Sequence, residues 1–118
     1  MILVDTFVWI DHFRSGSAEL EKRLGEQTVL MHPFVRGELA CGNLNNRAEI
    51  IGYLGRLSYA VLAQEEEVLK FIADHKLAGR GIGYIDMHLL ASCFLTGGAT
   101  LWTMDTRLAT AAATLGVA

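Results

Sequence analysis

Residues 1–11, MILVDTFVWID, run four apolar side chains directly into a carboxylate and then resume an apolar-rich pattern. The first four residues predict a buried strand, and residues 6–14 predict a helix because their apolar side chains recur at helical spacing. Asp5 stands between the two. Its carboxylate can cap the helix by accepting hydrogen bonds from the unpaired amides of the first turn, or it can take part in chemistry, and both interpretations remain open at this point.

Strand-like apolar runs alternate with helical patterns along the rest of the chain. This alternation predicts an α/β fold in which helices cover both faces of a central parallel sheet of four to five strands. Asn46-x-x-Glu49 predicts a capping box at the start of the fourth helix. The predicted strands are residues 1–4, 28–32, 59–63, 99–103 and, as a fifth, 117–118; the predicted helices are 6–14, 17–25, 33–41, 46–57, one that opens at 65, 86–96 and 106–115.

The composition describes a small, apolar and mildly acidic protein of 118 residues, with 52% hydrophobic and 19% charged side chains and a net charge of −3. This length predicts a single domain over residues 1–118 whose core needs no disulfide. The high apolar content suggests that a partner or a second copy covers part of the surface. The acidic balance argues against passive binding of nucleic acid through its phosphates, but it is compatible with an enzyme whose acids are offset by bound cations.

Nothing in the sequence indicates a membrane or an exported protein. No apolar run approaches the roughly 20 residues of a membrane span, and MILVD lacks the blocks of a signal peptide. We therefore expect a cytoplasmic protein that does not contact a membrane. Cys41 and Cys93 lie in apolar helical contexts, which is typical of reduced thiols in a core, and they form no zinc-binding spacing with the four histidines.

Four acids differ from the others because each has an apolar or aromatic neighbour, where an uncompensated charge is costly. Asp5 and Asp105 end predicted strands. Asp86 opens a helix, and Glu38 lies inside a mostly apolar one. Taken singly, each Asp is better explained as a helix cap. Parallel sheets, however, form their sites beyond the carboxyl ends of the strands, and clustered carboxylates that would repel one another are relieved by a hard cation such as Mg²⁺ or Mn²⁺.

The motifs VDT, GEL, DMHLLA and TMD, in this order and spacing, resemble the PIN-domain ribonucleases, in particular the toxins of bacterial VapBC toxin–antitoxin pairs. The resemblance covers the whole chain, including HPFVRGELACG, GRGIGYID and RLATAAATLGVA. It implies a three-layer α/β/α fold in which the first and fourth strands are neighbours. In that arrangement Asp5 lies next to Asp105, and helices supply Asp86 and Glu38 above them.

The resemblance also implies a function, namely metal-dependent hydrolysis of RNA phosphodiester bonds by an endoribonuclease toxin that inhibits translation. Such toxins cut transfer RNA or ribosomal RNA, form homodimers and are neutralised by a cognate antitoxin whose tail lies across the active-site groove. The residues implied as catalytic groups and ligands of Mg²⁺ or Mn²⁺ are Asp5, Glu38, Asp86 and Asp105.

Three further residues are candidates for supporting the acids or contacting RNA. Thr103 precedes Asp105 by two residues, so both project to the same side of an extended strand. Thr6 is a candidate of the same kind, although it equally suits a cap of the first helix. Arg80 lies in the glycine-rich loop before Asp86, and its planar guanidinium suits phosphates and carboxylates. Arg14 and Arg107 could make the same contacts, although each of the three arginines, taken singly, is better explained as an ordinary surface residue.

Phe7 departs from the family pattern, because relatives carry a small polar residue, commonly Ser or Asn, two places after the first acid. A phenylalanine removes a hydrogen bond near the acids without removing a metal ligand. The alternative function is therefore a catalytically weak PIN-like module whose main role is to bind its antitoxin. A phosphoacceptor receiver domain is disfavoured, since receivers require paired acids after the first strand and a lysine after the last, and this chain has no lysine beyond Lys76.

Overall fold

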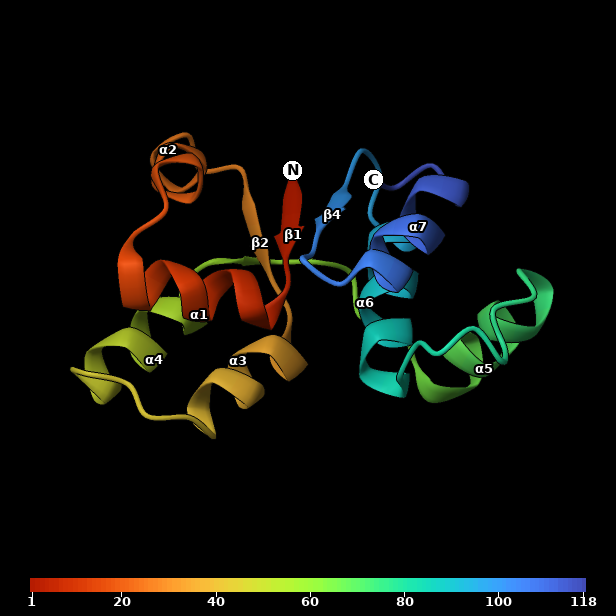
Figure 1. Ribbon diagram of the computed structural model, residues 1–118, viewed down its shortest axis with the longest axis horizontal. Helices are drawn as coiled ribbons and strands as arrows, with labels where there is room; N and C mark the ends of the chain where they lie inside the picture. Colours follow the sequence, from red (N-terminus) through yellow and green to blue (C-terminus); the bar gives the residue numbers. More distant parts are fainter.

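The computed structural model describes residues 1–118 and contains seven helices and one sheet of four strands (Figure 1). The strands are β1 (Ile2–Val4), β2 (Val29–Met31), β3 (Ser58–Tyr59) and β4 (Thr100–Trp102). The helices are α1 (Thr6–Ser15), α2 (Ala18–Gly25), α3 (Pro33–Ala40), α4 (Arg47–Gly55), α5 (Glu65–Asp74), α6 (Tyr84–Leu95) and α7 (Thr106–Thr114). None of these helices combines the length and the hydropathy that crossing a bilayer requires.

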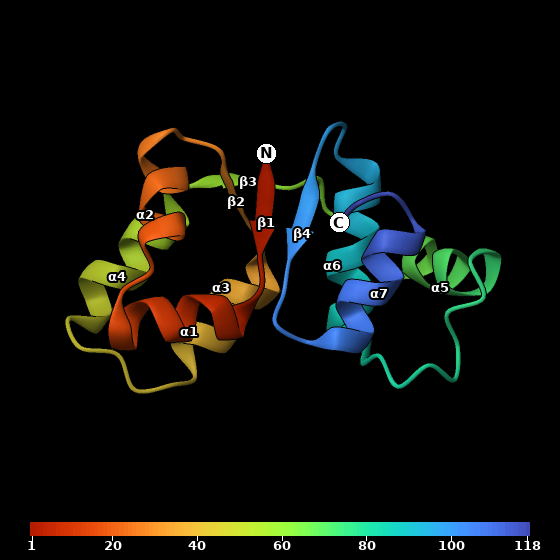
Figure 2. The ribbon, with the colours of Figure 1, turned by 45° about the horizontal axis from the view of Figure 1, so that its top comes forward.

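The sheet is parallel throughout, and its strand order is β3-β2-β1-β4. β1 pairs with β4 in a register that sets Leu3 opposite Leu101 and Val4 opposite Trp102, so the expected pairing of the first and fourth strands is confirmed. Strand order reverses between β1 and β4, which is where sheets of this kind form their binding sites. In both views α1–α4 lie on one side of the strands and α5–α7 on the other (Figure 1, Figure 2), and this is the predicted three-layer α/β/α fold.

The core lies between these layers and is built from 27 buried apolar residues. Every residue of β1 and of β2 is buried, as expected for parallel strands that are covered on both faces. Trp9 of α1 is fully buried and stacks on Phe13 with 5.7 Å between the ring centroids. The apolar content of β1 ends at Val4, so the next residue, Asp5, sits where the packed interior gives way to the end of the sheet.

Two sequence predictions about the ends of elements are wrong. Val117-Ala118 is not a strand: the amide of Leu101 donates a hydrogen bond to the Val117 carbonyl at 2.7 Å, but the sheet keeps four strands. The capping box at Asn46 is also absent: Asn46 has a left-handed backbone (φ 54°), and its side chain makes no capping hydrogen bond. A comparable contact forms at α5, where the Gln64 amide donates to Glu67 at 2.9 Å.

The two cysteines are both free, but only one lies in the core. Cys93 is buried in α6, as predicted, whereas Cys41 is exposed at the C-terminal end of α3. Burial raises the pKa of the Cys93 thiol to about 12, so this cysteine stays protonated and packs as a small apolar side chain.

Candidate functional site

Asp5 is the N-cap of α1 and is also tied to the neighbouring strand. Its Oδ1 accepts a hydrogen bond from the Thr6 amide at 2.7 Å, which confirms the capping interpretation. Its Oδ2 accepts a second bond, from the Thr103 hydroxyl beyond β4, also at 2.7 Å. The residue is only 7% exposed. A cap needs one oxygen, so the second contact holds this buried carboxylate in a fixed orientation at the β1–β4 pair.

Asp105 caps the last helix in the same way, because its Oδ1 accepts bonds from the amides of Arg107 and Leu108 at 2.9 and 3.2 Å. Glu38 belongs to α3, and its Oε1 accepts a bond from the Thr6 hydroxyl at 2.7 Å. Each of these carboxylates therefore has one oxygen engaged in a recorded contact. Thr6 therefore links α1 to α3, because its backbone amide donates to Asp5 and its side-chain hydroxyl donates to Glu38.

Asp86 lies in the first turn of α6, and the other three acids affect its pKa. Burial raises the pKa of Asp86 to about 6, and repulsion from the other three carboxylates adds to this shift, from Asp5, Asp105 and Glu38 in descending order. The structure has two ion pairs, Arg23–Glu19 and Lys70–Asp74, and neither involves the four acids. Four carboxylates from four elements thus share one electrostatic neighbourhood without a basic side chain to neutralise it.

The donor set fits a hard divalent cation, since carboxylate oxygens are the ligands that Mg²⁺ and Mn²⁺ prefer. A cation would also remove the repulsion that raises the pKa of Asp86. As the side chains stand, however, no three Asp, Glu, His or Cys residues are grouped closely enough to form a complete metal-binding set. The acids therefore form an open arrangement rather than a closed cage, and their role as ligands stays a prediction.

The supporting threonines contact the acids, although not all in the predicted way. Thr6 is buried and donates to Glu38. Thr103 was placed on the same side of its strand as Asp105, but its hydroxyl donates to Asp5 and accepts only the backbone amide of Asp105, at 3.1 Å. The chain bends after Trp102, so the alternation of an extended strand no longer applies there.

Arg107 is exposed, as predicted, and forms no ion pair with any of the four acids. It follows the capping Asp105, and its side chain lies over Gly81: a Cβ on Gly81 would come within 3.2 Å of its Cδ and Cζ and closer still to Nη1. Arg80 is exposed and makes no hydrogen bond or ion pair to any of the four acids. The available signal was the glycine itself, which has φ +76° and leaves room for the neighbouring side chain.

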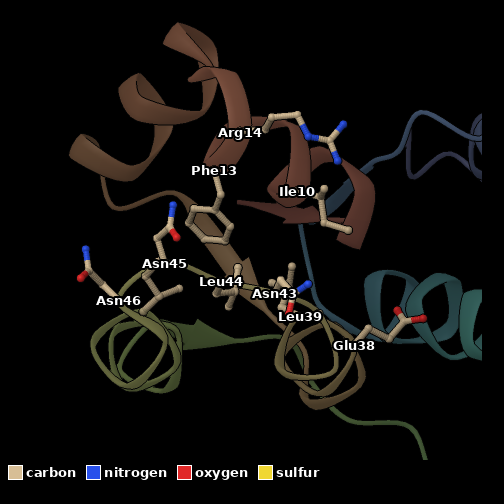
Figure 3. Close-up of a pocket in the computed structure, with 11 residues that line it drawn as sticks. Ile10, Phe13, Arg14, Glu38, Leu39, Asn43, Leu44, Asn45 and Asn46 are labelled. Atoms are coloured by element: carbon tan, nitrogen blue, oxygen red, sulfur yellow. The ribbon is translucent and has the colours of Figure 1, made fainter.

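A groove of about 640 Å³ adjoins the site between α1, α3 and the loop that leads to α4 (Figure 3). Its apolar side chains include Ile10, Phe13 and Leu39, and Phe13 points toward the loop across the hollow. Glu38 lies at one end with its carboxylate directed away from Phe13. This groove could not be predicted from the sequence, because its lining comes from three separate segments.

Comparisons with known proteins agree with this geometry. A family model described as PIN domain matches residues 2–113. Two proteins named Ribonuclease VapC32, from Mycobacterium tuberculosis strains CDC 1551 / Oshkosh and ATCC 25618 / H37Rv, are each 44% identical to this chain over 118 residues. These alignments cover 100% of this chain and 95% of each relative.

Proposed function

Since this chain belongs to the PIN-domain family and has relatives named as VapC ribonucleases, we propose that it is an endoribonuclease toxin that uses Mg²⁺ or Mn²⁺. It hydrolyses phosphodiester bonds of transfer RNA or ribosomal RNA in the cytoplasm and thereby inhibits translation. The observation that supports this most is that no ion pair joins the four acids to a basic side chain, while burial, and then repulsion from the other three, raises the pKa of Asp86 to about 6. A site built only for stability would pair its acids with basic side chains.

In this proposal Asp5, Glu38, Asp86 and Asp105 hold the cation through carboxylate oxygens. When bound, a divalent cation lowers the pKa of a water molecule and offsets the charge of the phosphate oxygens. Thr103 keeps the Asp5 carboxylate turned toward β4, and Thr6 keeps Glu38 turned toward α1. These hydroxyls act as positioning groups, since partners that orient the ligands commonly change metal affinity or activity by about 10- to 100-fold.

Metal removal provides the direct test. The protein, purified free of any antitoxin, is incubated with transfer RNA and ribosomal RNA in Mg²⁺, in Mn²⁺ or in EDTA. We expect cutting with either metal and a loss of at least about 100-fold in EDTA, since the cation contributes several kcal/mol to the transition state. Restored cutting after Mn²⁺ is added back is the control for intact folding.

The same assay examines the partner. We propose that the cognate antitoxin lies in the groove lined by Ile10, Phe13 and Leu39 next to Glu38, where an amphipathic helix could bury its apolar face. The product of an adjacent reading frame, added in equal amount, should stop the cutting.

Cutting that persists in EDTA would contradict the metal mechanism. Tight antitoxin binding without cutting in either metal would instead support the weak binding module.

We further propose that a second copy of the chain covers an apolar patch formed by Val61, Leu62, Phe94 and Leu95. These side chains are each roughly half exposed, and the Val61 amide donates to the Thr96 hydroxyl at 2.9 Å, which brings their two segments together. Light scattering should give about twice the 12.9 kDa chain mass, and Leu62→Glu should shift the protein to monomer, since a charge in a desolvated interface is costly. Tyr53→Glu on α4 is the control; a monomeric wild type would refute the dimer.

A further inference from the structure

Phe7 has the most exposed large apolar side chain of the molecule, at 69%. It follows Thr6, which bonds both Asp5 and Glu38, so its backbone is held at the edge of the acid site. The hydroxyl groups that orient these acids come from Thr6 and Thr103. Phe7 is therefore not needed to build the site, and its ring is free to contact something that enters it.

Met104 is the second most exposed of these side chains, at 59%, and it lies at the same edge. It stands between Thr103, which bonds Asp5, and Asp105, which caps α7. Because Val4 pairs with Trp102, the chain segments that carry Phe7 and Met104 leave neighbouring strands at the same end of the sheet. The two largest exposures of apolar surface in the chain thus flank the same acids.

We propose that Phe7, together with Met104, stacks an unpaired base of the RNA beside the scissile phosphate. This inference rests on the proposed function, which brings the phosphate to Asp5 and Asp105. The protein carries a net charge of −3, and its acid cluster repels a polyanion, so phosphate neutralisation contributes little affinity. Stacking on an aromatic ring does not depend on charge and is available only to bases that are not paired in a duplex.

The proposal assigns Phe7 a positioning role for the substrate. Phe7→Ala should weaken the binding of unpaired RNA by about tenfold, the order expected for one lost base–aromatic stack. Phe7→Trp should restore binding, because it keeps an aromatic face. Duplex RNA should bind wild type and Phe7→Ala equally. Since the ring is exposed, its removal should leave the melting temperature nearly unchanged.

The experiment uses a single-stranded RNA that contains 2-aminopurine, titrated with protein in Ca²⁺ in place of Mg²⁺. Wild type, Phe7→Trp and the control Tyr53→Ala, which truncates an exposed aromatic side chain on α4, should quench the base fluorescence; Phe7→Ala should not. Equal affinity and quenching for wild type and Phe7→Ala would overturn the proposal, as would a loss of antitoxin binding alone. If RNA binding depends on Phe7 but the protein cuts no RNA, the stacking proposal holds and the proposed function fails. If the protein cuts RNA but binding does not depend on Phe7, the proposed function holds and the stacking proposal fails.

Discussion

Asp5→Asn is expected to lower metal-dependent RNA cleavage by at least about 100-fold while leaving the fold intact. The substitution removes the charge that would bind the cation but keeps the shape of the side chain. Asparagine caps helices as well as aspartate does, so its oxygen can still accept the Thr6 amide bond that starts α1. Single-turnover cleavage rates in saturating Mn²⁺, compared with the melting temperature of the same sample, separate the chemical effect from unfolding.

Two companion variants sharpen this test. Asp11→Asn removes an exposed carboxylate from the same helix and should cut RNA like the wild type. Thr103→Val removes only the hydrogen bond to Asp5 Oδ2 and should slow cleavage by about tenfold, the effect typical of a group that orients a ligand. If Asp5→Asn cuts within tenfold of the wild type in Mn²⁺, Asp5 does not bind the catalytic metal.

Asp86→Asn is expected to stabilise the metal-free protein and to abolish its response to metal. In the folded protein the pKa of Asp86 is raised from 3.8 to about 6, so the folded state binds this proton more tightly than the unfolded chain does. The contribution of Asp86 to stability is therefore complete below about pH 4 and is lost as the pH rises to about 6. An asparagine cannot ionise, so the variant should melt at a higher temperature than the wild type at neutral pH without metal. The gain should be smaller than the full pKa shift implies, because solvent screens a carboxylate that is only partly buried.

Added Mn²⁺ should reverse the order of the melting temperatures, so that the wild type melts above Asp86→Asn. A cation that binds only the folded state raises the melting temperature of the wild type, whereas Asp86→Asn should gain little and should lose cleavage by at least about 100-fold. Asp74→Asn, which removes an exposed acid paired with Lys70, is the control and should keep both the metal response and the activity. Equal shifts with Mn²⁺ in wild type and Asp86→Asn would exclude Asp86 as a ligand.

Most of the fold could be predicted from the local pattern of apolar and polar residues. The errors occur where the local sequence does not determine the backbone conformation or the pairing of a segment. The alternation of apolar runs and helical periods predicted all seven helices and four of the five proposed strands. The prediction at Val117 failed because the single hydrogen bond from the Leu101 amide to the Val117 carbonyl does not make a strand, and the side-chain pattern does not show how many such bonds form. The prediction at Asn46 failed because the backbone there is left-handed, which the side-chain pattern does not reveal, and the side chain makes no capping hydrogen bond.

In the candidate site, too, some features could be predicted from the sequence and others depend on contacts between distant residues. The resemblance to PIN-domain ribonucleases implied that Asp5 lies next to Asp105, because it sets the first strand beside the fourth, and the structure pairs these two strands. The bonds that orient the acids join residues 32 and 98 positions apart, from Thr6 to Glu38 and from Thr103 to Asp5. No local pattern specifies such partners. The packing of Arg107 over Gly81 is of the same kind, since it depends on where a distant loop happens to pass.

The pairing of β1 with β4 has a consequence for the timing of biosynthesis. β1 is made first, but its partner, which carries Thr103 and leads into Asp105, is among the last segments to leave the ribosome. A nascent chain therefore carries an incomplete set of acids for almost the whole of its translation. Under the proposed function, cleavage of RNA therefore becomes possible only when translation of the chain is nearly complete.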